Sequence, residues 1–181
     1  MRLVEHHRQL LSKWRLVSNL VGPGSLDEHY LDCEAALAPL RPSGRWVDLG
    51  SGAGFPGIVF ASMFPDTQLE LVDSRQKRCA FLNHVLATSE PKLPQVTVKC
   101  QRIEELEDHS YDGVMARALA PPQEVLNLAQ RLLRPQGTVI LFLQQDAELI
   151  ERDGFERLWV SSYDVMGKHR AAVALKVAST V

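Results

Sequence analysis

The sequence lacks the residues that would cross-link a small domain or hold a metal ion. Its 181 residues include only three cysteines, Cys33, Cys79 and Cys100, which are never spaced as Cys-x-x-Cys. A disulfide framework and a zinc site are therefore both disfavoured. The six histidines form no His-x-x-x-His pair, so we expect no bound metal. Because Cys79 falls within an apolar helical pattern, we expect it to be a buried structural thiol rather than a reactive one.

Long hydrophobic runs are also missing. The longest aliphatic and aromatic run covers residues 139–143, whereas a helix needs about 20 apolar residues to cross a bilayer. The polar start, residues 1–12, lacks the apolar core of a secretory signal. We therefore expect a cytoplasmic protein that does not enter a membrane.

The composition shows no strong excess of one charge. Twenty Lys and Arg residues face 22 Asp and Glu residues, which gives a formal charge of -2, and 45% of the residues are hydrophobic. These values exclude disordered, collagen-like and coiled-coil chains. The length is that of one domain, so we expect a single domain over residues 1–181, and a monomer.

The near-neutral total hides an uneven distribution of charge. Residues 75–102 hold six Lys and Arg residues against one acidic residue, Glu90. Residues 104–112 hold five Asp and Glu residues and no Lys or Arg. A segregated surface of this kind can still attract a polyanion.

Two patterns divide the chain near residue 45. Residues 1–20 and 26–40 have the apolar spacing of amphipathic helices, with a glycine and proline break between them. After residue 45, short apolar runs alternate with helical stretches, which is typical of βαβ units in a parallel sheet. We expect an N-terminal helical arm over residues 1–44 and a core over residues 45–181. The expected strands cover residues 46–49, 69–72, 96–100, 111–115 and 138–143, and the expected helices cover residues 56–64, 76–88 and 122–133.

The C-terminal part has a different pattern. A short helical stretch is expected at residues 147–152, followed by strand-like runs at 158–165 and 171–177. The five residues between these runs cannot hold a crossover helix, so they predict an antiparallel hairpin. The whole pattern predicts an α/β, Rossmann-like fold: a mainly parallel seven-stranded sheet that ends in an antiparallel pair, with an N-terminal helical extension.

A glycine-rich turn links the first expected strand to its helix. Gly50, Gly52, Gly54 and Gly57 fall within eight residues. Such a turn bends sharply and brings a ligand close to the backbone, while the following helix offers free N–H groups. The pattern favours a nucleotide-like ligand over a turn that binds nothing.

Two aspartates distinguish between the possible ligands, because Gly52-x-Gly54-x-x-Gly57 also satisfies the dinucleotide fingerprint. Asp48 precedes the first glycine by two residues, where a carboxylate would repel a pyrophosphate but accept an ammonium group. Asp73 ends the second strand at a spacing suited to binding ribose hydroxyls, although a helix N-cap is the alternative. An adenosine joined to an amino acid, S-adenosylmethionine, satisfies both carboxylates.

These residues resemble the motifs of class I methyltransferases. The resemblance is strongest to the bacterial small-subunit (16S) rRNA guanine-N7 methyltransferases, the glucose-inhibited division protein B family. The chain keeps the His29 and Asp32 of that family, but has Val21, Cys33 and Gln144 where the family usually has Thr, Ser and Lys. The matching segments cover residues 50–57, 71–82, 102–105 and 116–120.

The resemblance implies S-adenosylmethionine as the cofactor and assigns roles to residues. It places Asp73 at the ribose and Arg117 at the end of the fourth strand, beside the reacting centre, as the catalytic candidate. A surface charge is the alternative for Arg117 and for Glu104. The full set of expected cofactor contacts is Asp48, Gly50, Gly52, Gly54, Phe55, Asp73, Ile103, Glu104 and Arg117.

The resemblance also implies a substrate, N7 of a guanosine in 16S rRNA or in the small ribosomal subunit. Three basic clusters would contact the RNA backbone, at residues 2–15, 75–78 and 168–170, although each has a solvated face as its alternative. Two other functions stay open. One is a methyltransferase of the same fold that acts on another RNA or on a small molecule, and the other is an NAD-binding Rossmann-like protein.

Overall fold

The computed structural model describes residues 3–14, 20–21, 25–144 and 150–178. Its centre is a seven-stranded sheet in the order β3-β2-β1-β4-β5-β7-β6. The first five strands in this order are parallel, while β7 and β6 are antiparallel to their neighbours. This topology confirms the α/β class and the C-terminal antiparallel pair. The strands are β1 (Arg45–Leu49), β2 (Gln68–Val72), β3 (Val96–Lys99), β4 (Tyr111–Arg117), β5 (Leu133–Leu143), β6 (Phe155–Val165) and β7 (Lys168–Val177).

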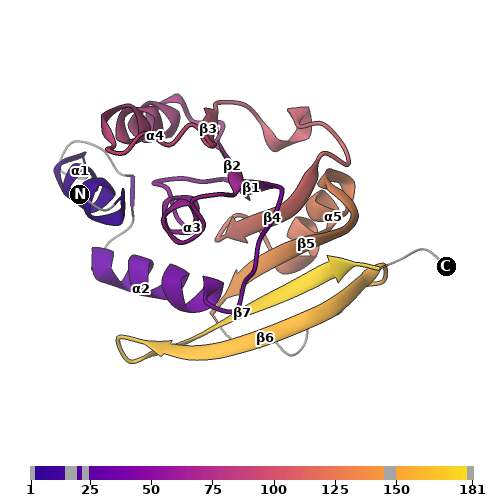
Figure 1. Ribbon diagram of the computed structural model, residues 1–181. Helices are drawn as coiled ribbons and strands as arrows, with labels where there is room; N and C mark the ends of the chain where they lie inside the picture. Colours follow the sequence, from indigo (N-terminus) through magenta and orange to yellow (C-terminus); the bar gives the residue numbers. More distant parts are fainter. Residues whose placement is uncertain (1–2, 15–19, 22–24, 145–149, 179–181) are drawn as a thin grey trace.

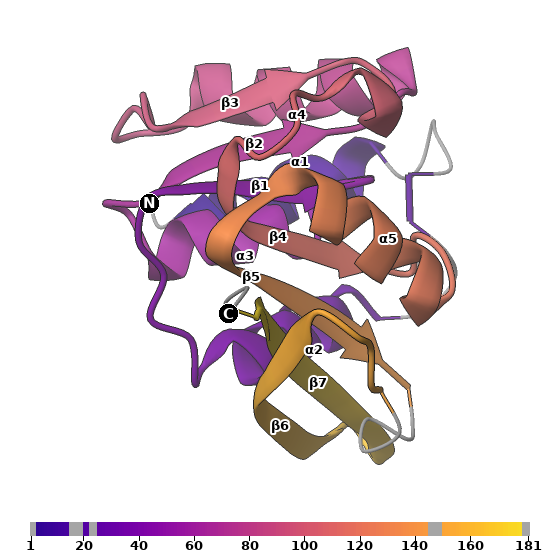
Figure 2. The same cartoon turned by 90° about the vertical axis from the view of Figure 1, so that its right-hand side faces the viewer.

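Helices cover both faces of the sheet (Figures 1 and 2). On one face α3 lies against the central strands, with α1, α2 and α4 around it. On the other face α5 covers β4 and β5. The helices are α1 (Leu3–Trp14), α2 (Leu26–Leu37), α3 (Gly57–Met63), α4 (Gln76–Thr88) and α5 (Pro122–Leu132), with a short 3₁₀ helix, η1 (Ile103–Glu105).

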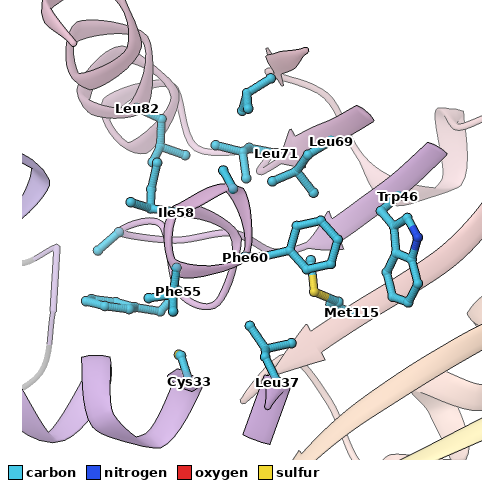
Figure 3. Close-up of a cluster of buried hydrophobic side chains, with 14 of the residues drawn as sticks. Cys33, Leu37, Trp46, Phe55, Ile58, Phe60, Leu69, Leu71, Leu82 and Met115 are labelled. Atoms are coloured by element: carbon cyan, nitrogen blue, oxygen red, sulfur yellow. The ribbon is translucent and has the colours of Figure 1, made fainter. Parts of the chain in front are cut away.

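Alternating side chains connect each inner strand to both layers. In β1, Trp46 belongs to the hydrophobic cluster under α3, whereas Val47 and Leu49 belong to the cluster under α5. Successive residues of a strand point to opposite faces, so a strand buried on both faces is apolar throughout. Figure 3 shows the first cluster, in which Trp46, Phe60 and Met115 lie close together between β1, α3 and β4.

Several element boundaries differ from the expectation. Strand β5 begins at Leu133 rather than residue 138, because Leu133 pairs with Tyr111 across an irregularity in the register. The β6–β7 link is only Met166 and Gly167, both with positive φ, as in a tight hairpin turn. Helix α2 ends earlier than expected, at Leu37, while residues 15–19 of the first expected helix lie outside the described residues. Half of the helix expected at 147–152 lies outside the described residues, and residues 150–152 are not helical.

The N-terminal helices share a core with the sheet. Leu11 of α1 and Tyr30, Cys33 and Leu37 of α2 are buried in the same cluster as α3. Helix α1 contacts α3 and α4, while α2 contacts α3, β6 and β7. Any ligand site near α3 is therefore also supported by α1 and α2.

The three cysteines differ in exposure. Cys79 is buried, as expected, and Cys33 is buried as well, whereas Cys100 is exposed. Within the described segments, no group of three His, Cys, Asp or Glu side chains is arranged to hold a metal ion. No helix in those segments has the length and apolar character that a membrane crossing requires.

Candidate cofactor site

A cavity of about 390 Å³ lies at the edge where the carboxyl ends of β1, β2, β3 and β4 meet. Strand β1 lies between β2 and β4, so the order of the strands along the chain changes direction at β1. Ligands of open α/β sheets bind at such a point. The expectation that Asp73 and the turn before Glu104 reach this edge is confirmed. The lining residues are Gly50, Val72, Asp73, Ser74, Arg75, Arg78, Gln101, Arg102, Ile103, Glu104, Ala118 and Leu119.

The glycine-rich loop joins β1 to α3 and forms one wall of this cavity. Gly50, Gly52 and Gly54 all have positive φ, of 69°, 57° and 103°, which side chains strongly disfavour. A Cβ on Gly50 would also come within 2.8 Å of Leu119 Cδ1. The loop therefore needs glycine for its shape, and Gly50 brings bare backbone to the cavity. Gly52 and Gly54 are not part of the cavity lining.

Asp73 immediately follows β2 and organises the rim of the cavity. Its Oδ2 accepts hydrogen bonds from the backbone N–H of Gly52 (3.0 Å) and from Arg78 Nη1 (3.1 Å). Its Oδ1 accepts a bond from the backbone N–H of Arg75 (2.9 Å). The N-cap of α4 is Arg75, so the alternative of Asp73 as the cap is wrong. Asp73 instead fixes the glycine loop and faces the cavity.

Asp48 lies behind the loop and outside the cavity lining. Its side chain is fully buried, and its Oδ2 accepts a hydrogen bond from the backbone N–H of Gly57 (2.9 Å) at the start of α3. Its Oδ1 has no hydrogen-bond partner among the described residues. Burial raises the pKa of Asp48 to about 7, although the Gly57 hydrogen bond opposes the rise. The carboxyl is therefore poised between its neutral and charged forms near neutral pH.

Arg117 is the last residue of β4 and is held from two sides. Its Nε donates to Asp32 Oδ2 (2.9 Å), and its Nη2 lies 3.0 Å from His29 Nδ1, both in α2. Tyr163 of β6 donates to the other oxygen of Asp32 (3.0 Å). Burial and the nearby guanidinium lower the pKa of His29, so His29 is suited to accept from Arg117. Arg117 is outside the cavity lining, but Ala118 and Leu119, which follow it, are part of the lining.

The remaining predicted contacts divide between the cavity and its support. Ile103 and Glu104, in η1, line the cavity. Phe55 is 7% exposed and lies under the Arg117 guanidinium, with its ring against those of His29 and Tyr30. The cavity therefore includes Gly50, Asp73, Ile103 and Glu104, while the other five lie around it, namely Asp48, Gly52, Gly54, Phe55 and Arg117.

Sequence reasoning missed several residues of the site. Arg75, Arg78 and Arg102 line the cavity, and their signals were a basic stretch and their place in the family segments 71–82 and 102–105. Tyr163 comes from β6, far along the chain, and no sequence signal marked it. His7 is buried against the loop, and its apolar helical position was the one available signal.

Both cations of the basic cluster at the β6–β7 turn are paired with one carboxylate. Lys168 donates to both oxygens of Glu28 (2.8 and 2.9 Å), and Arg170 donates to the same carboxylate (3.0 Å). The expected contact of this cluster with the RNA backbone stays a prediction.

The cavity residues fit S-adenosylmethionine. Gly50 leaves backbone exposed where a side chain would collide with Leu119, and Asp73 offers carboxylate oxygens at the rim. Ile103 supplies an apolar surface for a purine. Behind the loop and outside the lining, Asp48 Oδ1 is a buried acceptor with no donor among the described residues. An unsatisfied buried acceptor is costly, so a cationic donor nearby is favoured.

Comparison with protein families gives an independent result. Residues 1–172 match the model of the GidB family, described as rRNA small subunit methyltransferase G. The chain is 40% identical over 137 residues to "Ribosomal RNA small subunit methyltransferase G" of Paracoccus denitrificans (strain Pd 1222), across 73% of this chain and 70% of that protein. It is 30% identical over 163 residues to the protein of the same name from Aliarcobacter butzleri (strain RM4018), across 88% and 81%. Other matches are shorter, with 60% and 48% of the relatives from Hydrogenovibrio crunogenus and Rhizorhabdus wittichii covered.

Solved structures share the fold at low sequence identity. Magnesium protoporphyrin IX methyltransferase (ChlM) from Synechocystis PCC 6803, with bound SAM, matches 93% of this chain and 91% of its own with a TM-score of 0.62 at 14% identity. MtNAS in complex with MTA and tNA matches 98% and 70% with a TM-score of 0.64 at 18% identity. These likenesses confirm the class I methyltransferase fold. By its match over residues 1–172 and its curated relatives, the chain belongs to the GidB family, rRNA small subunit methyltransferase G, whose cofactor is S-adenosylmethionine.

Proposed function

We propose that this chain transfers the methyl group of S-adenosylmethionine to N7 of a guanosine in 16S rRNA. The observation that carries the proposal is a cavity lined by Asp73 together with a guanidinium, Arg117, that Asp32 fixes at the end of β4. Membership of the GidB family supports the rRNA substrate. The proposal includes a single domain, with residues 1–44 as a helical arm, that acts as a monomer.

The cofactor roles follow from the chemistry of each wall. S-adenosylmethionine supplies a methyl group already activated on a sulfonium. Asp73 accepts from the two ribose hydroxyls, while Ile103 and Glu104 receive the adenine ring and its amino group. Asp48, through its unpartnered oxygen, accepts the ammonium of the methionine part. Gly50, with Gly52 and Gly54 behind it, carries no side chain, so the ligand can approach the backbone of the loop.

Arg117 orients the target base. Guanine N7 has a lone pair and no proton to lose, so no general base is needed and positioning dominates, which can be worth about 7–11 kcal/mol. The fork of Arg117 suits guanine O6 or a phosphate. Because Asp32 and His29 already hold two of its nitrogens, the guanidinium is presented in one orientation. Phe55 lies beneath it.

The basic residues beside the cavity are better placed for the RNA backbone than those of the hairpin. Arg75, Lys77 and Arg102 are exposed at or near the cavity rim, whereas Lys168 and Arg170 are bound to Glu28. We expect the pair Arg75→Gln with Arg102→Gln to raise the KM for rRNA about tenfold and to flatten its salt dependence. The matched pair Lys168→Gln with Arg170→Gln should change the KM for rRNA much less.

The direct test is tritiated methyl transfer by the purified chain to 16S rRNA and to small subunits from a strain that lacks the modification. Digestion should place the label in N7-methylguanosine. Label in another nucleotide, or transfer only to small molecules, would reject the rRNA assignment. Fully modified subunits serve as the negative substrate.

A titration separates the methyltransferase from the NAD-binding alternative. S-adenosylhomocysteine should bind in calorimetry, whereas NAD should not, since a carboxylate at Asp48 would oppose a pyrophosphate. Binding of NAD alone would overturn the proposed cofactor.

A further inference from the structure

A buried histidine of α1 contacts the back of the glycine-rich loop. His7 is 0% exposed. Its Nε2 lies 2.7 Å from the backbone oxygen of Ala53, and its Nδ1 lies 2.6 Å from the Tyr30 hydroxyl. A carbonyl oxygen can only accept, so Nε2 carries the proton and donates to Ala53. The Nδ1 of the neutral ring then accepts from Tyr30, and both ring nitrogens are satisfied in a single tautomer.

The surroundings of His7 keep that arrangement neutral and rigid. The rings of Tyr30, Phe55 and Phe81 lie 5.4–5.8 Å from its own ring, centre to centre. Burial lowers the pKa of His7 to about 4, which agrees with a neutral donor at physiological pH. Arg8 lies over the other side of the Tyr30 ring, at 4.5 Å from its centre.

Ala53 occupies the centre of the loop that the cofactor site needs. The preceding residue, Gly52, donates its N–H to Asp73 on the cavity side. A Cβ on the following residue, Gly54, would come within 3.1 Å of His7 Nε2, so the loop and the imidazole are in close contact. The loop is therefore held at two neighbouring residues, by Asp73 through the N–H of Gly52 and by His7 through the carbonyl of Ala53.

We propose that His7 is a positioning residue for S-adenosylmethionine, which acts by holding the Ala53 carbonyl, with Tyr30 fixing its tautomer. The inference rests on the proposed function for the identity of the ligand. It makes α1 a part of the cofactor site, 46 residues before the loop that it holds. A histidine that only fills the core would affect folding but not the affinity of the folded chain for the ligand.

The experiment compares His7→Leu, His7→Gln and Tyr30→Phe in the full chain, with His6→Leu as the matched control. His6 is on the same helix and bonds to Thr88 rather than to the loop. Calorimetry with S-adenosylhomocysteine gives Kd, urea unfolding gives stability, and methyl transfer gives kcat and the KM for S-adenosylmethionine.

We expect the folded His7→Leu chain to bind S-adenosylhomocysteine about tenfold more weakly, with kcat at saturating cofactor within about threefold of the parent. His7→Gln should recover most of the affinity, because its amide N–H can donate to Ala53. Tyr30→Phe keeps the ring and should raise Kd about threefold. His6→Leu should leave Kd unchanged.

A parental Kd in folded His7→Leu overturns the proposal, as does a Kd in His7→Gln no better than in His7→Leu. If His7→Leu does not fold, Tyr30→Phe decides, and a parental Kd there also overturns it. Nitrogen NMR of the parent should show the proton on Nε2, and a proton on Nδ1 instead would contradict the tautomer. Failure of the parent itself to bind S-adenosylhomocysteine would count against the proposed function, which keeps the two failures distinct.

Discussion

Asp48 and Asp73 stand at the ends of adjacent parallel strands, yet their surroundings are opposite. Asp48 is the fourth residue of β1 and pairs in register with Leu71, inside the sheet. Asp73 is one residue beyond the end of β2. The first carboxyl has one backbone donor and an unpartnered oxygen, whereas the second has three donors. Both are almost completely covered, at 0% and 4% exposed.

The difference follows from strand alternation and strand length. Asp48 shares a strand face with Trp46, which packs under α3, so its side chain lies beneath the start of that helix. Asp73 has left the sheet, and its side chain can turn toward the cavity and gather N–H groups from the loops. A carboxylate inside a strand, such as Asp48, thus becomes part of the framework. A carboxylate that lies one residue beyond the end of a strand, such as Asp73, becomes part of the cavity rim.

The largest effect should come from Asp73. Asp73→Ala removes the ribose acceptor and also the anchor of Gly52, so we expect the Kd for S-adenosylhomocysteine to rise about 100-fold. Calorimetry on the folded variant measures this. Asp66→Ala, in an exposed turn before β2, is the matched control and should bind like the parent. A change below threefold would show that Asp73 is structural only.

Next comes the pH dependence of stability set by Asp48. Folding raises the pKa of this carboxyl from 3.8 to about 7, so the folded chain binds more protons than the unfolded chain between these values. The free energy of unfolding therefore falls as pH rises through this window, by about 3 kcal/mol from this group. Urea unfolding between pH 4.5 and 7.5 should show a smaller fall in Asp48→Asn. Equal slopes in both chains would contradict the raised pKa.

Cofactor affinity should also depend on pH through Asp48. If its charged form accepts the ammonium of the cofactor, Kd for S-adenosylhomocysteine should decrease about tenfold from pH 5.5 to pH 7, as the carboxyl ionises. Asp48→Asn should bind more weakly and show little change over the same range. A parental slope in the variant would remove Asp48 from the ligand contacts while leaving its role under α3 intact.

The smallest effect should come from Arg78. Its Nη1 shares Asp73 Oδ2 with Gly52, so Arg78→Met loses one partly exposed ion pair but frees that oxygen for the ribose. We expect Kd to change by less than about threefold. A rise in Kd of 30-fold or more would mean that Arg78 contacts the cofactor directly. Cofactor binding at the rim would then depend on Arg78 as much as on Asp73.

The fold and the core of the site could be predicted because their signals are local. Alternating apolar runs and helices fix a parallel sheet, and the Gly50–Gly57 turn requires a close approach of backbone to ligand. The position of Asp73 after its strand predicts the rim by topology alone, since carboxyl ends of parallel strands meet at one edge. The family motifs carried the assignment of S-adenosylmethionine, which family membership confirms.

Sequence reasoning could not predict which charged groups would find partners. The hairpin folds back onto α2 and pairs Lys168 and Arg170 with Glu28. Arg117 depends on Asp32, 85 residues away, and on Tyr163 from β6. Such contacts depend on where strands and helices cross in the folded molecule, and the spacing of residues along the chain does not predict this.

The sequence determined the fold class, the glycine loop, the rim carboxylate and the family, because each rests on periodicity or on a motif within a few residues. Tertiary structure alone decided that Asp48 is buried beneath α3, that His7 supports the loop from α1, and that Arg117 is held by Asp32. The physical reason is burial. The pKa of a carboxyl and the tautomer of a histidine depend on what surrounds them, and only the packed molecule brings those surroundings together.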